Sequence, residues 1–222
     1  MPEIKKIEGI VISDTNYGES SKILNILTKD YGIIGVMSKG CRKVKSNLRT
    51  VSNKLIYGNF NVYFKTNGLS TLISVDLNRY YKNIMTDIIK ISYATYLIEL
   101  TSQTYKQNPT REIYNLLIDG LNKIEDNFDP LIITNIIEIK YLNYLGIDIN
   151  IDSCNICGNQ TDILTLSSKA GGFVCKECYS NEKIVSSKAI KVIRMLYYVD
   201  ISKITKLELA NQTINSLISF IV

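Results

Sequence analysis

Two pairs of cysteines in the last third of the chain restrict its fold more than any other feature. Cys154 and Cys157 form one Cys-x2-Cys pair, and Cys175 and Cys178 form a second, with seventeen residues between the pairs. This spacing is typical of a zinc site in which a short hairpin brings four thiolates into a tetrahedron. Because the chain contains no histidine, a closed site here has only thiolates to use. We therefore predict a structural Zn²⁺ held by these four cysteines.

The same cysteines allow a second interpretation, a redox dithiol or a pair of disulfides, but the spacing favours zinc. A catalytic zinc is disfavoured, because catalysis needs an open coordination position and usually mixed ligands. Cys41 lies far away in the sequence, and we expect it to be an ordinary core or surface thiol.

The N-terminal third carries the positive charge of the chain and is typical of β-structure. Residues 1–80 hold twelve Lys or Arg against six Asp or Glu, although the net charge of all 222 residues is only +5. Five short β-type runs follow one another here, separated by turn signals such as Asn67-Gly68. They cover residues 7–13, 23–28, 33–38, 55–65 and 69–75. Five strands in so short a segment predict a Greek-key barrel of the OB-fold type.

The segment between the third and fourth predicted strands is the most basic in the chain. It carries six cations and no acid: Lys39, Arg42, Lys43, Lys45, Arg49 and Lys54. Such a run is either a solvated loop or a phosphate-binding patch, and it could hold the short helix that an OB-fold places there. The barrel context favours the phosphate-binding patch, because OB-folds bind single-stranded nucleic acid through a basic groove and stacking aromatic residues. Tyr17 and the aromatic residues of the fourth strand are candidates for stacking, although core packing competes for each of them.

The rest of the chain has helical periodicity. Residues 81–106 predict one largely buried helix with apolar stripes that include Ile84, Ile88 and Ile89. Further helices are expected after Asn108, which would be an N-cap, after Pro130, after Ser186 or Ser187, and from Leu207 to Ile221. The fold class is therefore α+β and multi-domain. The predicted parts are a barrel domain, 1–79, and a helical domain, 80–222, interrupted at 151–182 by the zinc hairpin.

Several function classes lack their sequence signatures. Without histidine there is no Ser-His-Asp or Cys-His site of the usual form, and neither GxxxxGK[ST] nor GxGxxG occurs. No run of about 18–20 apolar residues predicts a membrane span. The first eight residues have no apolar segment of the secretory type, so we expect a cytoplasmic protein.

Four short motifs resemble the start of the bacterial DNA repair protein RecO family. They are the opening run 7–13, Tyr17-Gly-Glu-Ser-Ser-Lys-Ile-Leu24, Leu27-Thr-Lys-Asp-Tyr-Gly32 and Ser38-Lys-Gly-Cys-Arg-Lys43. Each motif is short, but their order and spacing together are specific, and the resemblance extends over most of the chain. Family members combine an N-terminal OB-fold with a helical C-terminal domain, often with an inserted CxxC…CxxC hairpin. They usually continue beyond the position of Phe220 with a further stretch, and this sequence departs from the family pattern in lacking that stretch.

The resemblance implies a recombination mediator that is not an enzyme. Such a protein binds single- and double-stranded DNA, anneals complementary strands, and binds RecR and the acidic C-terminal tail of single-stranded DNA-binding protein. It thereby promotes RecA loading in the RecF pathway, and it is nucleoid-associated in the cytoplasm. Neither a membrane nor a small-molecule substrate is implied. The basic segment would bind phosphates without reading bases, and the tail-binding pocket is expected in the helical domain.

Two alternatives come from different functional classes. One is a zinc-containing nucleic-acid enzyme, such as a metal-dependent nuclease that uses Asp14 or Asp30. The other is a pure protein-interaction scaffold whose N-terminal charge only promotes solubility. A transcription regulator is less favoured, because no helix-turn-helix pattern with a basic recognition helix is present.

Overall fold

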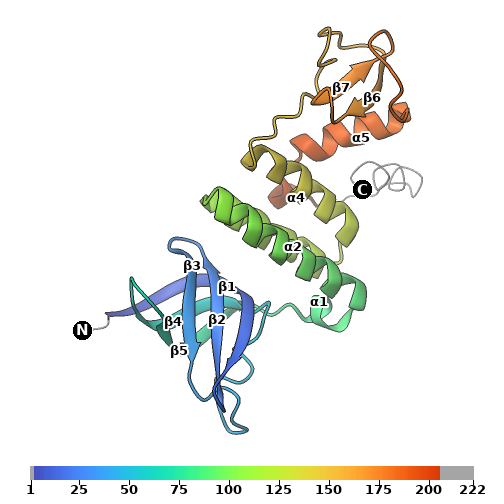
Figure 1. The fold of residues 1–222 in the computed structure, drawn as a ribbon. Helices are drawn as coiled ribbons and strands as arrows, with labels where there is room; N and C mark the ends of the chain where they lie inside the picture. Colours follow the sequence, from blue (N-terminus) through green and yellow to red (C-terminus); the bar gives the residue numbers. More distant parts are fainter. Residues whose placement is uncertain (1–2, 206–222) are drawn as a thin grey trace. The chain divides into compact units, whose positions relative to one another are not determined.

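The computed structural model describes residues 3–205 of the chain (Figure 1). These residues divide into two compact units, which meet in sequence between Asn127 and Phe128. The helix predicted from Leu207 to Ile221 lies outside the described residues. No helix among the described residues is long and apolar enough to cross a membrane.

Five strands near the N-terminus close into a barrel. They are β1 (Glu3–Tyr17), β2 (Ser21–Thr28), β3 (Gly32–Ser38), β4 (Tyr57–Phe64) and β5 (Ser70–Arg79). The order around the barrel is β1-β2-β3-β5-β4, and β4 returns to pair with β1. All pairings are antiparallel except β3 with β5, which is parallel. The predicted five-stranded OB-fold is therefore confirmed, and the mixed α+β class with it.

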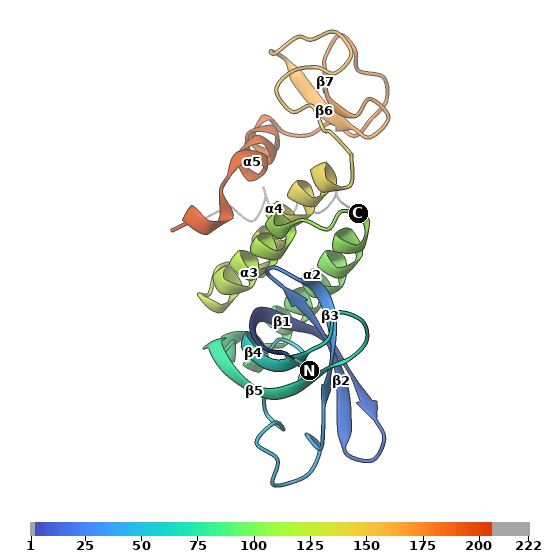
Figure 2. The same ribbon diagram turned by 90° about the vertical axis from the view of Figure 1, so that its left-hand side faces the viewer.

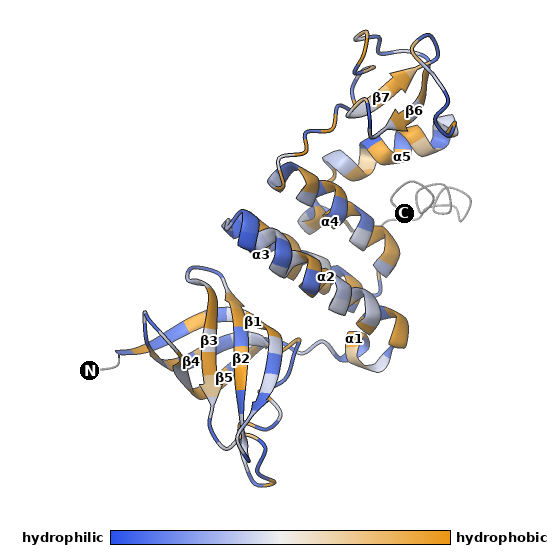
Figure 3. Ribbon diagram, viewed as in Figure 1, coloured by the Kyte–Doolittle hydropathy of each residue, from blue (hydrophilic) through white to orange (hydrophobic). Residues whose placement is uncertain are grey.

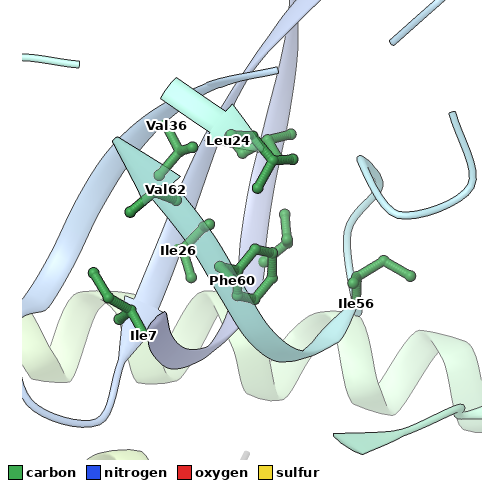
Figure 4. Packing of buried hydrophobic residues seen from close by; sticks show 9 residues of the cluster. Ile7, Leu24, Ile26, Val36, Ile56, Phe60 and Val62 are labelled. Carbon is green, nitrogen blue, oxygen red and sulfur yellow. The ribbon is translucent and has the colours of Figure 1, made fainter. Parts of the chain in front are cut away.

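The barrel encloses one apolar cluster, which Figure 4 shows from close by. On β4 the buried members Phe60 and Val62 alternate with partly exposed residues, because successive side chains of a strand point to opposite faces. Phe60 is fully buried at the centre of β4, with Ile26 of β2 and Val36 of β3 also fully buried around it. Burial of this cluster is the main driving force for closing the barrel.

Strand β1 is long because it pairs with two neighbours, and glycines make this possible. Gly9 lies opposite Thr28 of β2 and also opposite Gly58 of β4. A Cβ atom on Gly58 would approach the carbonyl oxygen of Asp76 to 2.5 Å, and one on Gly9 would approach the carbonyl oxygen of Leu27 to 2.8 Å. The backbones of the neighbouring strands thus come too close for a side chain at these two positions.

The segment between β3 and β4 contains no helix, so the short helix that the sequence suggested there was wrong. Its backbone makes separate turns instead: the N–H groups of Lys43, Ser46 and Arg49 each donate to the carbonyl three residues earlier. Because these bonds do not follow one another at consecutive residues, the turns do not merge into a helix.

Three helices complete the first unit: α1 (Lys82–Thr86), α2 (Ile88–Gln107) and α3 (Arg111–Glu125). The single helix predicted over 81–106 is interrupted at Asp87, whose extended backbone and side chain cap α2 through the N–H groups of Ile89 and Lys90. The predicted burial is wrong for Ile88 and Ile89, which are 79% and 59% exposed. The next helix begins after Thr110 rather than Asn108.

The second unit contains α4 (Pro130–Tyr144), a two-stranded hairpin and α5 (Ser187–Tyr198). As predicted, Pro130 begins α4, Gly146 follows its C-cap with a φ of 78°, and Ser186 caps α5 by accepting from Ala189 N–H. The hairpin strands are β6 (Ile163–Ser167) and β7 (Gly172–Cys175), and β7 is coloured mostly hydrophobic in Figure 3. A short 3-10 turn, Ile201–Lys203, follows α5.

Candidate metal centre and DNA interface

The four cysteines of the two Cys-x2-Cys pairs lie together at the hairpin. Their sulfur atoms are all within 4.8 Å of one another, and Cys157 Sγ lies 3.6 Å from Cys175 Sγ. All four thiols are free, so no disulfide joins them. Four sulfurs at about 2.3 Å from one zinc ion are about 3.8 Å apart at the corners of a tetrahedron. The arrangement therefore fits a four-thiolate metal site.

Backbone hydrogen bonds shape the first cysteine pair for this arrangement. Cys154 N–H donates to the carbonyl of Asn159 over 2.7 Å, and Gly158 N–H donates back to the carbonyl of Cys154 over 2.8 Å. Gly158 takes a φ of 76°, a left-handed conformation that glycine adopts at little cost. The chain thus turns sharply enough for Cys154 and Cys157 to face the same point.

The cysteines differ in their environment. Cys154 and Cys175 are buried, whereas Cys157 is exposed. Burial opposes ionisation of Cys154, but backbone N–H groups of Cys175, Cys157 and Ile156 stabilise its thiolate and lower its pKa to about 6. The neighbouring Cys157 sulfur raises the pKa of Cys178 to about 12. Four thiolates this close repel one another, and a divalent cation at their centre would relieve that repulsion.

The six predicted DNA-binding cations lie on one surface segment, residues 39–54, which we call the basic loop. Figures 1 and 2 both show it beyond the end of β3, at the same end of the barrel as the β1–β2 turn. Five of its cations are exposed and Lys54 is partly buried. The exposed residues are Lys39, Arg42, Lys43, Lys45 and Arg49.

None of these six cations forms an ion pair with a carboxylate in the part of the chain that the structure describes. Other barrel cations are paired: Lys6 with Asp76 at 2.9 Å, and Lys29 with Glu8 at 3.3 Å. The basic loop therefore presents uncompensated positive charge, which attracts an anionic polymer.

The start of the basic loop is tied to the β1–β2 turn. Arg42 N–H donates to the carbonyl of Ser20 over 2.8 Å, and Arg42 Nη1 donates to the carbonyl of Gly18 over 3.3 Å. Tyr17 precedes this turn and is 54% exposed. The structure therefore brings Tyr17 next to the basic loop, where its ring is open to stacking.

The aromatic residues of β4 divide between core and surface. Phe60 is buried in the barrel core. Tyr57 stacks on Tyr81 with ring centroids 6.2 Å apart, and Phe64 packs against Tyr31 at 5.1 Å. Tyr63 is the one whose ring is substantially open, at 43% exposure. Core packing thus accounts for most of this strand, as the competing interpretation expected.

The carboxylates named for the nuclease alternative do not form a metal-binding group. Asp14 pairs with Lys22 at 2.7 Å, and Asp30 faces Arg111 at 3.8 Å. Within residues 3–205, the four cysteines are the only cluster of three or more His, Cys, Asp or Glu with metal-ligand spacing. The sequence patterns did not predict the role of Lys22. Its ammonium group forms an ion pair with Asp14 and a hydrogen bond with Asn53 inside the first unit.

A closed five-stranded OB-fold barrel with an exposed basic loop, followed by helices and a four-cysteine hairpin, defines an OB-fold protein with a candidate metal site. The family models for the N-terminal and C-terminal parts of recombination protein O match residues 1–81 and 85–221. The DNA repair protein RecO of Listeria welshimeri is 32% identical over 214 residues, 95% of this chain and 84% of that protein. The DNA repair protein RecO of Bacillus pumilus is 32% identical over 212 residues, which cover 94% of this chain and 82% of that protein. The chain belongs to the RecO family of DNA repair proteins.

Proposed function

We propose that this protein is a recombination mediator that binds single- and double-stranded DNA through the barrel domain, residues 1–79. The observation that carries the proposal is the basic loop, whose six cations have no carboxylate partner within residues 3–205. Lys39, Arg42, Lys43, Lys45, Arg49 and Lys54 bind phosphates, and Tyr17 stacks on an unpaired base. Phosphate contacts position the strand and carry no base specificity, which suits a protein that acts on any sequence.

Strand annealing follows from the same chemistry. Two complementary strands repel each other through their phosphates, and cations that contact both backbones reduce this repulsion. Because binding does not read bases, the strands remain free to pair. No covalent step is needed, so the protein acts without enzymatic turnover.

Membership of the RecO family supports the further partners. The protein binds RecR and the acidic C-terminal tail of single-stranded DNA-binding protein, and in this way promotes RecA loading on coated DNA in the RecF pathway. These interactions place it in the cytoplasm, associated with the nucleoid. The DNA-contacting surface lies on the barrel, which leaves the helical domain for protein partners.

The four cysteines hold a structural Zn²⁺ in this proposal. Cys154, Cys157, Cys175 and Cys178 supply all four ligands, so a tetrahedral ion has no open position for a substrate. The ion fixes the hairpin, whose small apolar cluster around Val174 is too limited to hold it alone.

The test is the salt dependence of single-stranded DNA binding. The native chain is compared with a variant in which Lys39, Arg42, Lys43, Lys45 and Arg49 are replaced by Ala. For single strands the slope of log K against log salt changes by about 0.7 per phosphate contact, so the slope should flatten by up to about 3.5. Affinity at low salt should fall with it.

A matched control removes the same charge elsewhere. Lys169, Lys176, Lys183, Lys188 and Lys191 are also exposed, and their replacement by Ala changes the net charge equally. The control should keep most of the affinity and slope. If both variants bind DNA as tightly as the native chain does, the basic loop is not the DNA-binding site. The alternative of a pure protein-interaction scaffold would then be favoured. If both lose affinity equally, overall charge and not a site governs binding.

A further inference from the structure

The end of the basic loop returns to the barrel at one ion pair. Lys22 of β2 and Asp14 of β1 are joined by 2.7 Å between Nζ and Oδ1, and their side chains are only 17% and 22% exposed. Asp14 Oδ2 also accepts the backbone N–H of Lys54 over 3.0 Å, so the carboxylate holds the last residue of the loop directly.

Lys22 makes two more bonds to the same part of the loop. Its Nζ donates to Asn53 Oδ1 over 2.8 Å and to the carbonyl oxygen of Ser52 over 3.2 Å. An ammonium group has three donors, and Asp14, Asn53 and Ser52 use all three. Lys22 therefore has no donor left for a phosphate, although it lies beside the most basic segment of the chain.

The hydrogen bonds continue into the cationic part of the loop. Asn53 Nδ2 donates to the carbonyl oxygens of Arg49 and Thr50 over 3.2 and 3.3 Å. Ser52 Oγ lies 2.7 Å from Ser38 Oγ at the end of β3, and both serines are buried. The backbone that carries Arg49 is thus linked through Asn53 to the Lys22–Asp14 pair.

We propose that Lys22 and Asp14 are positioning residues, which hold the basic loop in the conformation that binds DNA without contacting DNA themselves. This inference rests on the proposed function of the loop. A loop ordered before binding does not spend free energy on immobilising its backbone and side chains when the phosphates arrive. The arrangement also gives a structural role to an acidic residue that lies next to a surface whose proposed ligand is anionic.

Replacing Asp14 by Asn separates positioning from simple electrostatics. The change removes a negative charge near the loop, so charge alone predicts tighter DNA binding. It also breaks the ion pair that holds Lys22, so positioning predicts weaker binding. Immobilising one or two side chains costs enough to weaken single-stranded DNA binding about 3- to 10-fold. The salt slope should stay unchanged, because the number of cations that meet phosphates is the same.

The barrel offers a matched control in a second ion pair. Lys6 and Asp76 are joined at 2.9 Å on the outer face, with both side chains 58% exposed. Asp76→Asn removes the same charge without touching the loop and should not weaken binding. In the same way Lys22→Met should lose affinity about as much as Asp14→Asn, and Lys6→Met should not. The double variant Lys22→Met with Asp14→Asn should bind DNA no more weakly than either single variant, because all three variants remove the same Lys22–Asp14 ion pair.

Amide hydrogen exchange supplies a readout that does not involve DNA. In Asp14→Asn the N–H of Lys54, and those of residues 49–53, should exchange faster than in the native chain and in Asp76→Asn. Unchanged circular dichroism would show that the barrel is folded in each variant.

The outcomes separate this inference from the proposed function. If the five-alanine variant loses affinity but Asp14→Asn binds as well as Asp76→Asn, the positioning role is wrong and the DNA-binding loop remains. Unchanged amide exchange in Asp14→Asn would overturn the positioning role as well. If the five-alanine variant itself binds normally, the proposed function fails, and the positioning role for DNA fails with it.

Discussion

The hydroxyl group of Tyr114 in α3 donates a hydrogen bond to Glu8 Oε1 in β1 over 3.2 Å. The same oxygen accepts the hydroxyl of Tyr57 over 3.0 Å, and Oε2 pairs with Lys29 at 3.3 Å. Tyr114 is 2% exposed. One carboxylate thus joins the barrel to a helix whose residue lies 106 positions further along the chain.

Removing the Tyr114 hydroxyl should therefore loosen the connection between the barrel and α3. Tyr114→Phe keeps the ring and removes one hydrogen bond to a charged group, which should lower the free energy of unfolding by about 1–2 kcal/mol. Urea denaturation measures this. The control is Tyr198→Phe, which removes a 2.7 Å bond to Asp152 from a ring that is 60% exposed and should cost much less. Equal losses would contradict the role of Tyr114.

The same carboxylate should make stability depend on pH in the acid range. Burial raises the pKa of Glu8, but hydrogen bonds from Tyr57, Lys29 and Tyr114 and the Lys29 charge together lower it below its usual value. A group with a lowered pKa in the folded state stabilises the fold above its unfolded pKa, about 4.3 for glutamate, and loses that effect as the pH falls through the folded pKa. The native chain should therefore lose stability more steeply below about pH 4.3 than Glu8→Gln. Parallel acid profiles for the two proteins would contradict this.

Metal removal should destabilise the second unit, which contains the cysteine hairpin, and leave the barrel unchanged. We expect one zinc ion per chain by atomic absorption, and none after Cys157→Ser or Cys175→Ser. A ligand at about 100 times its dissociation constant stabilises the state it binds by about 2.7 kcal/mol, so chelation should lower the melting temperature of the second unit. Cys41→Ala is the control and should keep the full zinc content, since Cys41 lies in the first unit. Normal zinc content in Cys175→Ser would contradict the four-cysteine site.

A methyl group at Gly58 should separate β4 from β5. The added Cβ would meet the carbonyl oxygen of Asp76 at 2.5 Å and the Cα of Leu77 at 3.1 Å, and neither backbone atom can move alone. Gly58→Ala should destabilise the barrel by about 1–3 kcal/mol, as overpacking does in well-packed cores. Thr66→Ala in the exposed β4–β5 turn should change stability by less than about 0.5 kcal/mol. Thermal unfolding of both variants tests this, and a neutral Gly58→Ala would show that the strands tolerate a wider spacing.

The sequence was informative wherever a local pattern carried the signal. Turn dipeptides and alternating residues predicted the five strands, because strand periodicity and turn conformation are set by neighbouring residues. The capping residues Ser186 and Gly146 were recognised for the same reason. Helix burial was not recognised correctly: Ile88 and Ile89 are apolar, but no other element of the first unit covers them. A periodic apolar stripe shows that a helix has such a face, and it does not show what packs there.

By itself, the sequence determined the order of the strands, the pair of cysteine motifs and the basic loop, since each depends on residues close together in the chain. Only the tertiary structure decided how those parts are used. It assigned the charge of Lys22 to Asp14 and Asn53, left the six cations of the basic loop without a carboxylate partner in residues 3–205, and brought Tyr114 to Glu8. The physical reason is that hydrogen bonds and ion pairs depend on distances of a few ångströms between residues that are 31 or 106 positions apart in the chain. Those distances exist only once the barrel has closed.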